Sequence, residues 1–282
     1  MSGRGASTAR RGIAETTTDA GQELPRGAFA AMGTVVSVRL GAEGVYVDAA
    51  VSAVGAAFAR WEARCSLFEP ASELSRIGRG ELALADASDD VRNAYATALD
   101  WRARTGDAFT PHRGDGLIDL NGVVKALAIA EAGAALDRAG FTRWAVDAGG
   151  DVLAAARAAA DDPDPDAWRI GIVDPADRRA LLARIDLGGR RTAVATSGSA
   201  ERGDHIWTRP GAGPSPFQQA SVAAGDILTA DVLATAIVSG GRTALDEFTE
   251  RFDIDVLAVQ RDGSLLATPG WPRAPLGGRV AR

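Results

Sequence analysis

The sequence is poor in the residues that build disulfides and zinc sites. Cys65 is the only cysteine among 282 residues, which excludes an internal disulfide and any cysteine cluster for a metal. His112 and His205 are the only histidines, so a histidine-rich zinc site does not fit this chain. A bound metal would have to rely on oxygen ligands, which favour Mg²⁺, Ca²⁺ or Mn²⁺.

Long apolar runs and an excess of positive charge are also absent. No apolar run is long enough to span a membrane, and the net charge of −6 argues against a general nucleic-acid surface. Residues 1–27 contain Arg10-Arg11, but no apolar segment follows the pair, so they match neither a Sec nor a twin-arginine signal. We therefore expect a disordered N-terminal tail over residues 1–27 and a cytoplasmic protein.

The remaining composition is that of an ordinary globular protein, with 46% hydrophobic and 24% charged residues. Helical and strand patterns are mixed without a regular βαβ alternation, which predicts an α+β fold with mixed sheets and packed helices. We expect a domain of one or two lobes over residues 28–268 and a C-terminal tail over 269–282. Expected strands include residues 34–40, 144–146, 168–173, 181–187, 192–196, 220–223, 255–260 and 265–267. We expect 181–187 and 192–196 to pair with each other, and 255–260 and 265–267 to form a final hairpin around Asp262-Gly263. We expect 154–166 to be an exposed connection.

The most informative stretch runs from Gly116 to Gly150. Asp119 and Asn121 suit a helix start, and apolar residues then recur at helical spacing as far as Gly140. Lys125 lies early in this helix, so an acid, a base and unpaired backbone N–H groups would gather at one helix N-terminus. That arrangement is an anion site. The alternative is that Asp119 only caps the helix and that Lys125 is solvated.

Two later segments carry possible catalytic chemistry. Asp231 and Thr235 are four residues apart, so on a helix they share one face and can contact one hard cation. The alternative is that Asp231 caps the helix and binds no metal. Ser197 lies in a small-residue turn that can hold phosphate oxygens, and His205 is a possible general base or a surface histidine. His112 reads as a loop residue without a role.

Met32 and Phe68 can contact a flat aromatic ligand, through sulfur contact and stacking respectively. Core packing is the alternative for both.

Taken in order, these segments resemble the FAD:protein FMN transferase family (ApbE-type flavin transferases). The resemblance extends from about Phe29 to Gly241 and rests on a series of motifs: AMGTVVSV, SLFEPASELSRI, GDAFTP, DLNGVVKALAIAEA, VDAGGDV, WRIGIVDP, AVATSGSAERGDHIW and TADVLATAIVSGG.

The resemblance implies an ApbE-like fold and the transfer of FMN from FAD to a threonine or serine hydroxyl of an acceptor protein, with Mg²⁺ bound and AMP released. It also implies residue roles. The Mg²⁺ ligands would be Asp231, Thr235 and the Gly122 carbonyl, and His205 would be the catalytic base. The residues in contact with FAD would be Met32, Phe68, Asp119, Lys125 and Ile206, and we add Ser197 as a phosphate contact.

Four positions depart from the family pattern, namely Asn121, Ala126, Ala130 and Thr208. Thr208 replaces an acid in the segment that follows His205. Two alternatives to the transferase therefore stay open, a protein that binds FAD without transfer and a Mg²⁺-dependent FAD pyrophosphatase.

Overall fold

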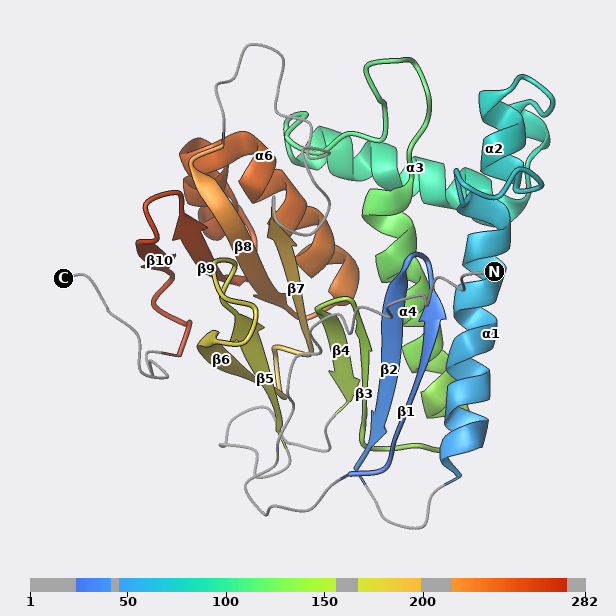
Figure 1. Cartoon of the computed structure of the whole chain (residues 1–282). Helices are drawn as coiled ribbons and strands as arrows, with labels where there is room; N and C mark the ends of the chain where they lie inside the picture. The colour runs from blue at the N-terminus through green and yellow to red at the C-terminus, as the bar shows by residue number, and fades with distance from the viewer. Residues whose placement is uncertain (1–23, 42–45, 156–166, 199–214, 273–282) are drawn as a thin grey trace, which may run out of the picture.

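The computed structural model describes residues 24–41, 46–155, 167–198 and 215–272, and these residues form a layered α+β structure (Figure 1). Its centre is an eight-stranded sheet in the order β1-β2-β3-β4-β7-β8-β9-β10, in which every neighbouring pair is antiparallel. The strands are β1 (Arg26–Ala31), β2 (Thr34–Leu40), β3 (Trp144–Ala148), β4 (Asp151–Ala155), β7 (Ala193–Gly198), β8 (Phe217–Ala224), β9 (Asp255–Gln260) and β10 (Leu265–Ala267). A separate hairpin consists of β5 (Trp168–Val173) and β6 (Leu181–Leu187).

Helices cover one face of the large sheet, and the β5–β6 hairpin packs on the other (Figure 1). The helices are α1 (Val47–Cys65), α2 (Glu73–Gly78), α3 (Asp89–Arg104), α4 (Asn121–Arg138) and α6 (Ile227–Arg251), with a short 3₁₀ turn at Leu84–Asp86. The alternation of side chains along a strand separates the two cores. Val146 of β3 belongs to the core under the helices, whereas its neighbour Ala145 belongs to the core under the hairpin.

Most of the expected elements are confirmed, including the strand at Thr34–Leu40 and the final hairpin. Ser72 caps α2 by accepting a hydrogen bond from the Ser75 amide, and Gly140 ends the α4 segment with φ of 85°. None of the helices in the described ranges is long and apolar enough to cross a membrane.

Three local expectations were wrong. Residues 181–187 pair with β5 and not with residues 192–196, because β7 lies in the large sheet between β4 and β8. Ala154 and Ala155 belong to β4 and not to an exposed connection; Ala154 is buried and Ala155 is partly buried. Arg26 and Gly27, placed in the N-terminal tail, start β1 by pairing with β2.

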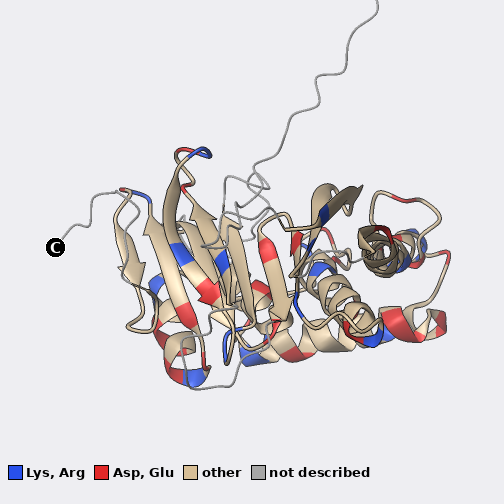
Figure 2. Cartoon of the chain, turned by 90° about the horizontal axis from the view of Figure 1, so that it is seen from below, with Lys and Arg blue, Asp and Glu red and all other residues tan. Residues whose placement is uncertain are grey.

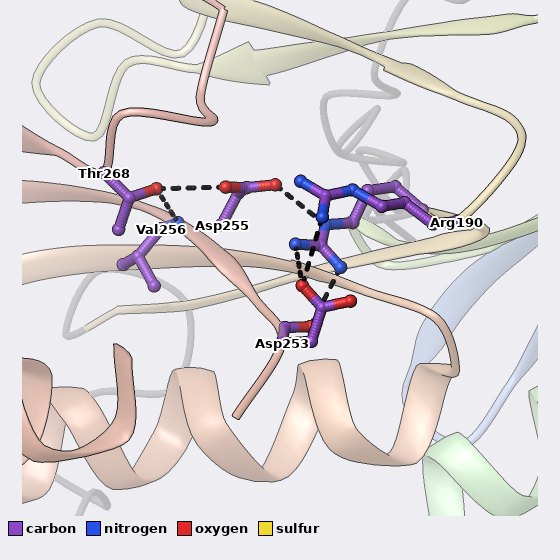
Figure 3. A network of polar contacts seen from close by, with 6 residues as sticks. Arg190, Asp253, Asp255, Val256 and Thr268 are labelled. Atoms are coloured by element: carbon purple, nitrogen blue, oxygen red, sulfur yellow. Dashed lines mark hydrogen bonds and ion pairs between the residues drawn. The ribbon is translucent and has the colours of Figure 1, made fainter. Parts of the chain in front are cut away.

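An ion-pair network joins the β6–β7 connection to the start of β9 (Figure 3). The Arg191 guanidinium donates to Asp255 Oδ2 at 2.8 Å and to Asp253 Oδ1 at 2.7 Å, and Thr268 donates to the other oxygen of Asp255 at 3.4 Å. Elsewhere acidic and basic residues lie side by side along the helices, as expected for a solvated surface (Figure 2).

Candidate active site

A buried charged cluster lies where α4, β4 and α6 meet under the large sheet. Lys125 Nζ forms an ion pair with Asp151 Oδ2 and lies 3.8 Å from Asp231 Oδ2. The side chains of these residues are 14%, 0% and 4% exposed. Two carboxylates from different elements thus hold one ammonium group in a place that water barely reaches, which fixes the position of Lys125.

The β3–β4 turn sets the position of Asp151. Gly149 and Gly150 have φ of 68° and 95°, which side chains rarely allow, and the Gly150 amide donates to Asp147 Oδ1 at 2.9 Å. The turn brings Asp151 to the start of β4, where its Oδ1 accepts the Thr196 amide of β7 at 3.1 Å. One carboxylate oxygen of Asp151 therefore accepts a hydrogen bond from the sheet, and the other pairs with Lys125.

Two hydroxyl groups lie beside this cluster. Ser197 Oγ and Thr235 Oγ1 are 2.9 Å apart, and Thr235 is one helical turn after Asp231 on the same face of α6. The helix begins with Asp226, whose side chain accepts the Thr229 amide at 2.8 Å. Asp231 is therefore not the cap of this helix, and the capping alternative for Asp231 is wrong.

The start of α4 brings Asp119 and Gly122 to the same region. Asp119 Oδ1 accepts the Asn121 amide at 2.9 Å. A side chain at Gly122 would meet the ring of buried Phe109 at 2.5 Å, so the close approach of the α4 backbone to this ring requires glycine. No described contact joins Asp119 to Lys125; the acids that Lys125 contacts are Asp151 and Asp231.

The loop before Asp119 is tied to α3 through His112. Tyr95 Oη is 2.9 Å from His112 Nε2, and Arg102 Nη1 is 3.2 Å from His112 Nδ1. Because a guanidinium only donates, Nδ1 must accept, which puts the ring proton on Nε2. His112, which we expected to have no role, therefore anchors this loop.

The two candidate flavin contacts differ in their surroundings. Met32 lies in the β1–β2 turn, half-buried at the edge of the core, and its amide donates to Glu62 Oε1 at 3.1 Å. Phe68 follows α1 and is 92% exposed.

The model of the ApbE family matches residues 32–115 and 112–258 of this sequence, well over half of the chain. The chain belongs to the ApbE family. The resemblance that the sequence motifs indicate is thereby confirmed.

Solved structures of ApbE proteins share the fold. The ApbE protein of Thermotoga maritima has 20% sequence identity and a TM-score of 0.72, and the match covers 88% of this chain and 97% of that one. The flavinyl transferase ApbE of Pseudomonas stutzeri, in its apo form, has 20% identity and a TM-score of 0.70, over 88% and 95%. The flavin transferase ApbE of Vibrio cholerae has 18% identity and a TM-score of 0.69, over 88% and 98%. No curated protein matches the sequence.

The ApbE fold brings four of the expected site residues together, namely Lys125, Ser197, Asp231 and Thr235. His205, Ile206 and Thr208 lie outside the described residues. Asp151 is a site residue that the sequence reasoning did not assign. Its signal was an acid placed directly after the Gly149-Gly150 turn and before an apolar strand, where a charge needs a partner.

The candidate metal ligands carry the type of donor atom that a hard cation binds. The described residues contain no group of three or more His, Cys, Asp and Glu side chains placed to hold a metal. The Asp231 carboxylate, the Thr235 hydroxyl and the Gly122 carbonyl offer oxygen only, which is the chemistry that Mg²⁺ prefers. These three groups are the ones that could hold Mg²⁺ here.

Proposed function

We propose that this protein is a Mg²⁺-dependent FAD:protein FMN transferase that attaches FMN to a threonine or serine of an acceptor protein and releases AMP. The observation that carries the proposal is the buried cluster of Lys125, Asp151 and Asp231 beside the Ser197 and Thr235 hydroxyls, in a member of the ApbE family. Two related structures are named as flavin or flavinyl transferases, which supports the same reading. We expect the reaction to take place in the cytoplasm.

The cluster suits a bound pyrophosphate. Lys125 is held by two carboxylates with its ammonium group fixed, so it can meet a phosphate oxygen without losing much conformational freedom on binding. Asp119 and the first amides of α4 would orient the nucleotide, because the N-terminus of a helix favours negative charge. Ser197 would donate its hydroxyl to a phosphate oxygen.

The proposed metal ligands are Asp231, Thr235 and the Gly122 carbonyl. When bound, Mg²⁺ supplies positive charge against the pyrophosphate oxygens. The buried position of Asp231, which is 3% exposed, protects this electrostatic interaction from water.

The proposed transfer is a substitution at phosphorus without any redox change. The acceptor hydroxyl oxygen bonds to the phosphorus of the FMN half of FAD, and the bond from that phosphorus to the bridging oxygen breaks. AMP leaves with the bond's electron pair, and the hydroxyl proton passes to a base. We assign the base to His205, because a histidine near neutral pKa suits proton transfer at physiological pH. Met32, Phe68 and Ile206 would contact the flavin half.

The test is an incubation with FAD and Mg²⁺, with and without a peptide that carries the acceptor threonine. We expect AMP and an acceptor whose mass increases by FMN less one water, and we expect EDTA to abolish both. His205→Ala and Asp231→Asn should each lower the rate at least about a hundredfold, as expected for loss of a general base or a metal ligand. Asp226→Asn is the matched control, because asparagine caps α6 as well as aspartate does and should leave the rate unchanged.

The same assay separates the two alternatives. AMP and free FMN without a labelled acceptor would identify a pyrophosphatase. FAD that binds and is recovered intact would identify a binding protein, and the transferase proposal would then be wrong.

A further inference from the structure

The β1–β2 turn holds a methionine in a backbone conformation that methionine disfavours. Ala31 pairs with Thr34, so the loop consists of Met32 and Gly33 alone. Their φ angles are 48° and 69°, both in the left-handed region. A two-residue hairpin loop with both φ positive prefers asparagine, aspartate or glycine at its first position, because these residues tolerate that region. Met32 therefore occupies a position for which its backbone is poorly suited.

The other such position in the described chain follows the usual preference. Apart from glycines, only Met32 and Asp107 have positive φ among the described residues, at 48° and 65°. Aspartate adopts this conformation at little cost, whereas methionine has no local hydrogen bond to offer. A residue observed in such a strained conformation points to a use for its side chain.

Glu62 fixes this turn from a distance of 30 residues along the chain. Its Oε1 accepts a hydrogen bond from the Met32 amide at 3.1 Å, from the last part of α1. The turn is thus attached to the helix layer by a hydrogen bond to a carboxylate, which is the stronger kind.

The β1–β2 turn lies at the same end of the sheet as the charged cluster, with one strand, β3, between them. The Gly149 amide donates to the Val35 carbonyl at 3.3 Å, and a side chain at Gly149 would meet Thr34 Oγ1 at 2.5 Å. Asp151 begins β4 just after Gly149 and Gly150. The β1–β2 turn and the start of β4 therefore lie at the same end of the sheet (Figure 1). Two strand spacings, or about 10 Å, separate β2 from β4.

We propose that Glu62 is a positioning residue that holds the Met32 turn in its strained conformation, so that the Met32 side chain contacts the flavin ring of bound FAD. A thioether is polarizable and packs well against an aromatic ring. The inference rests on the proposed function, because FAD is the ligand against which Met32 is placed. It predicts that relief of the strain stabilises the fold and weakens flavin binding, which a methionine used only for packing would not do.

The test measures FAD affinity by quenching of flavin fluorescence, and thermal stability on the same samples. Met32→Asn should raise the melting temperature and weaken FAD binding about two- to tenfold. Glu62→Ala should weaken FAD binding about three- to tenfold, through loss of the hydrogen bond that fixes the turn. Glu62→Gln keeps an acceptor oxygen and should restore affinity to within about twofold of the wild type.

Two further variants show whether Glu62 acts through Met32. The double variant of Glu62→Ala and Met32→Asn should bind FAD no more weakly than Met32→Asn alone, because residues that act through one contact are not additive. Glu247→Ala is the matched control, since Glu247 is an exposed glutamate of α6 that pairs only with its neighbour Arg251 in the described structure.

The outcomes separate this inference from the proposed function. A wild-type protein that does not bind FAD would refute both. A wild-type protein that binds FAD, with Glu62→Ala or Met32→Asn binding equally well, would refute the inference alone. Additive effects in the double variant would also overturn it, as would an equal loss in Glu247→Ala.

Discussion

Replacement of Asp151 by asparagine tests the buried cluster directly. The Asp151 side chain is 0% exposed, its Oδ1 accepts the Thr196 amide, and its Oδ2 pairs with Lys125. Asparagine has nearly the same shape and can still accept from Thr196. The change therefore removes one negative charge and leaves the Lys125 ammonium with the more distant Asp231, at 3.8 Å.

The size of the effect follows from burial. Removal of one partner of a fully buried ion pair costs about 3–5 kcal/mol, because the remaining charge stays out of water. Lys125 is 14% exposed, so some hydration of its ammonium remains possible. We therefore expect Asp151→Asn to lower the free energy of unfolding by about 2–4 kcal/mol. The exposed pair of Arg242 and Asp246 gives the comparison, and Asp246→Asn should cost at most about 0.5 kcal/mol.

Urea denaturation of the variants measures these free energies. The decisive sample is Lys125→Met, with and without Asp151→Asn. Lys125→Met leaves the buried Asp151 carboxylate without its ammonium partner, so Asp151→Asn should stabilise that background although it destabilises the wild type. A loss in Asp151→Asn no larger than in Asp246→Asn, or the same sign of effect in both backgrounds, would refute the reasoning.

Three further predictions concern other parts of the chain. Burial raises the pKa of the Cys65 thiol to about 12, so we expect no alkylation of the native protein at pH 8 and full alkylation in urea; rapid labelling of the native protein would contradict this. The hydrogen bond from Arg191 holds the pKa of Asp253 below its usual value, so its contribution is present above the unfolded pKa of about 4 and is lost as the pH falls through the folded pKa. Because Asp253 is 70% exposed, this loss of unfolding free energy at low pH should stay below about 1 kcal/mol. When the free energy of unfolding is measured against pH, the Asp253→Asn variant should not show this loss. Gly122→Ala places a methyl group against the buried Phe109 ring and should destabilise the protein by about 1–3 kcal/mol in the same urea assay; an unchanged free energy of unfolding would contradict this.

Much of the fold follows from local patterns that the sequence displays openly. The alternation in Thr34–Leu40 and the turn signal of Asp262-Gly263 depend on neighbouring residues only, and the structure has both elements in place. The Ser72 cap and the stop at Gly140 are likewise local, so they are predictable without a tertiary structure.

The errors lie where pairing over long distances decides the outcome. Residues 181–187 and 192–196 look like a hairpin because few residues separate them, yet β7 pairs with β4, about 40 residues earlier in the chain. No local pattern specifies such a partner, since the choice depends on which apolar faces the whole sheet can bury. Ala154 and Ala155 likewise end a strand whose partner, β7, lies far along the chain.

The candidate site divides in the same way. The sequence by itself determined that Asp231 and Thr235 share a helix face and that any metal must take oxygen ligands, because helical periodicity and composition are properties of the chain alone. Only the tertiary structure decided that Asp151 pairs with Lys125 and that Glu62 holds Met32, because each pair joins elements far apart in the sequence. Such contacts form only when the packing of helices on the sheet brings these side chains together, and they are what turns separate motifs into a site.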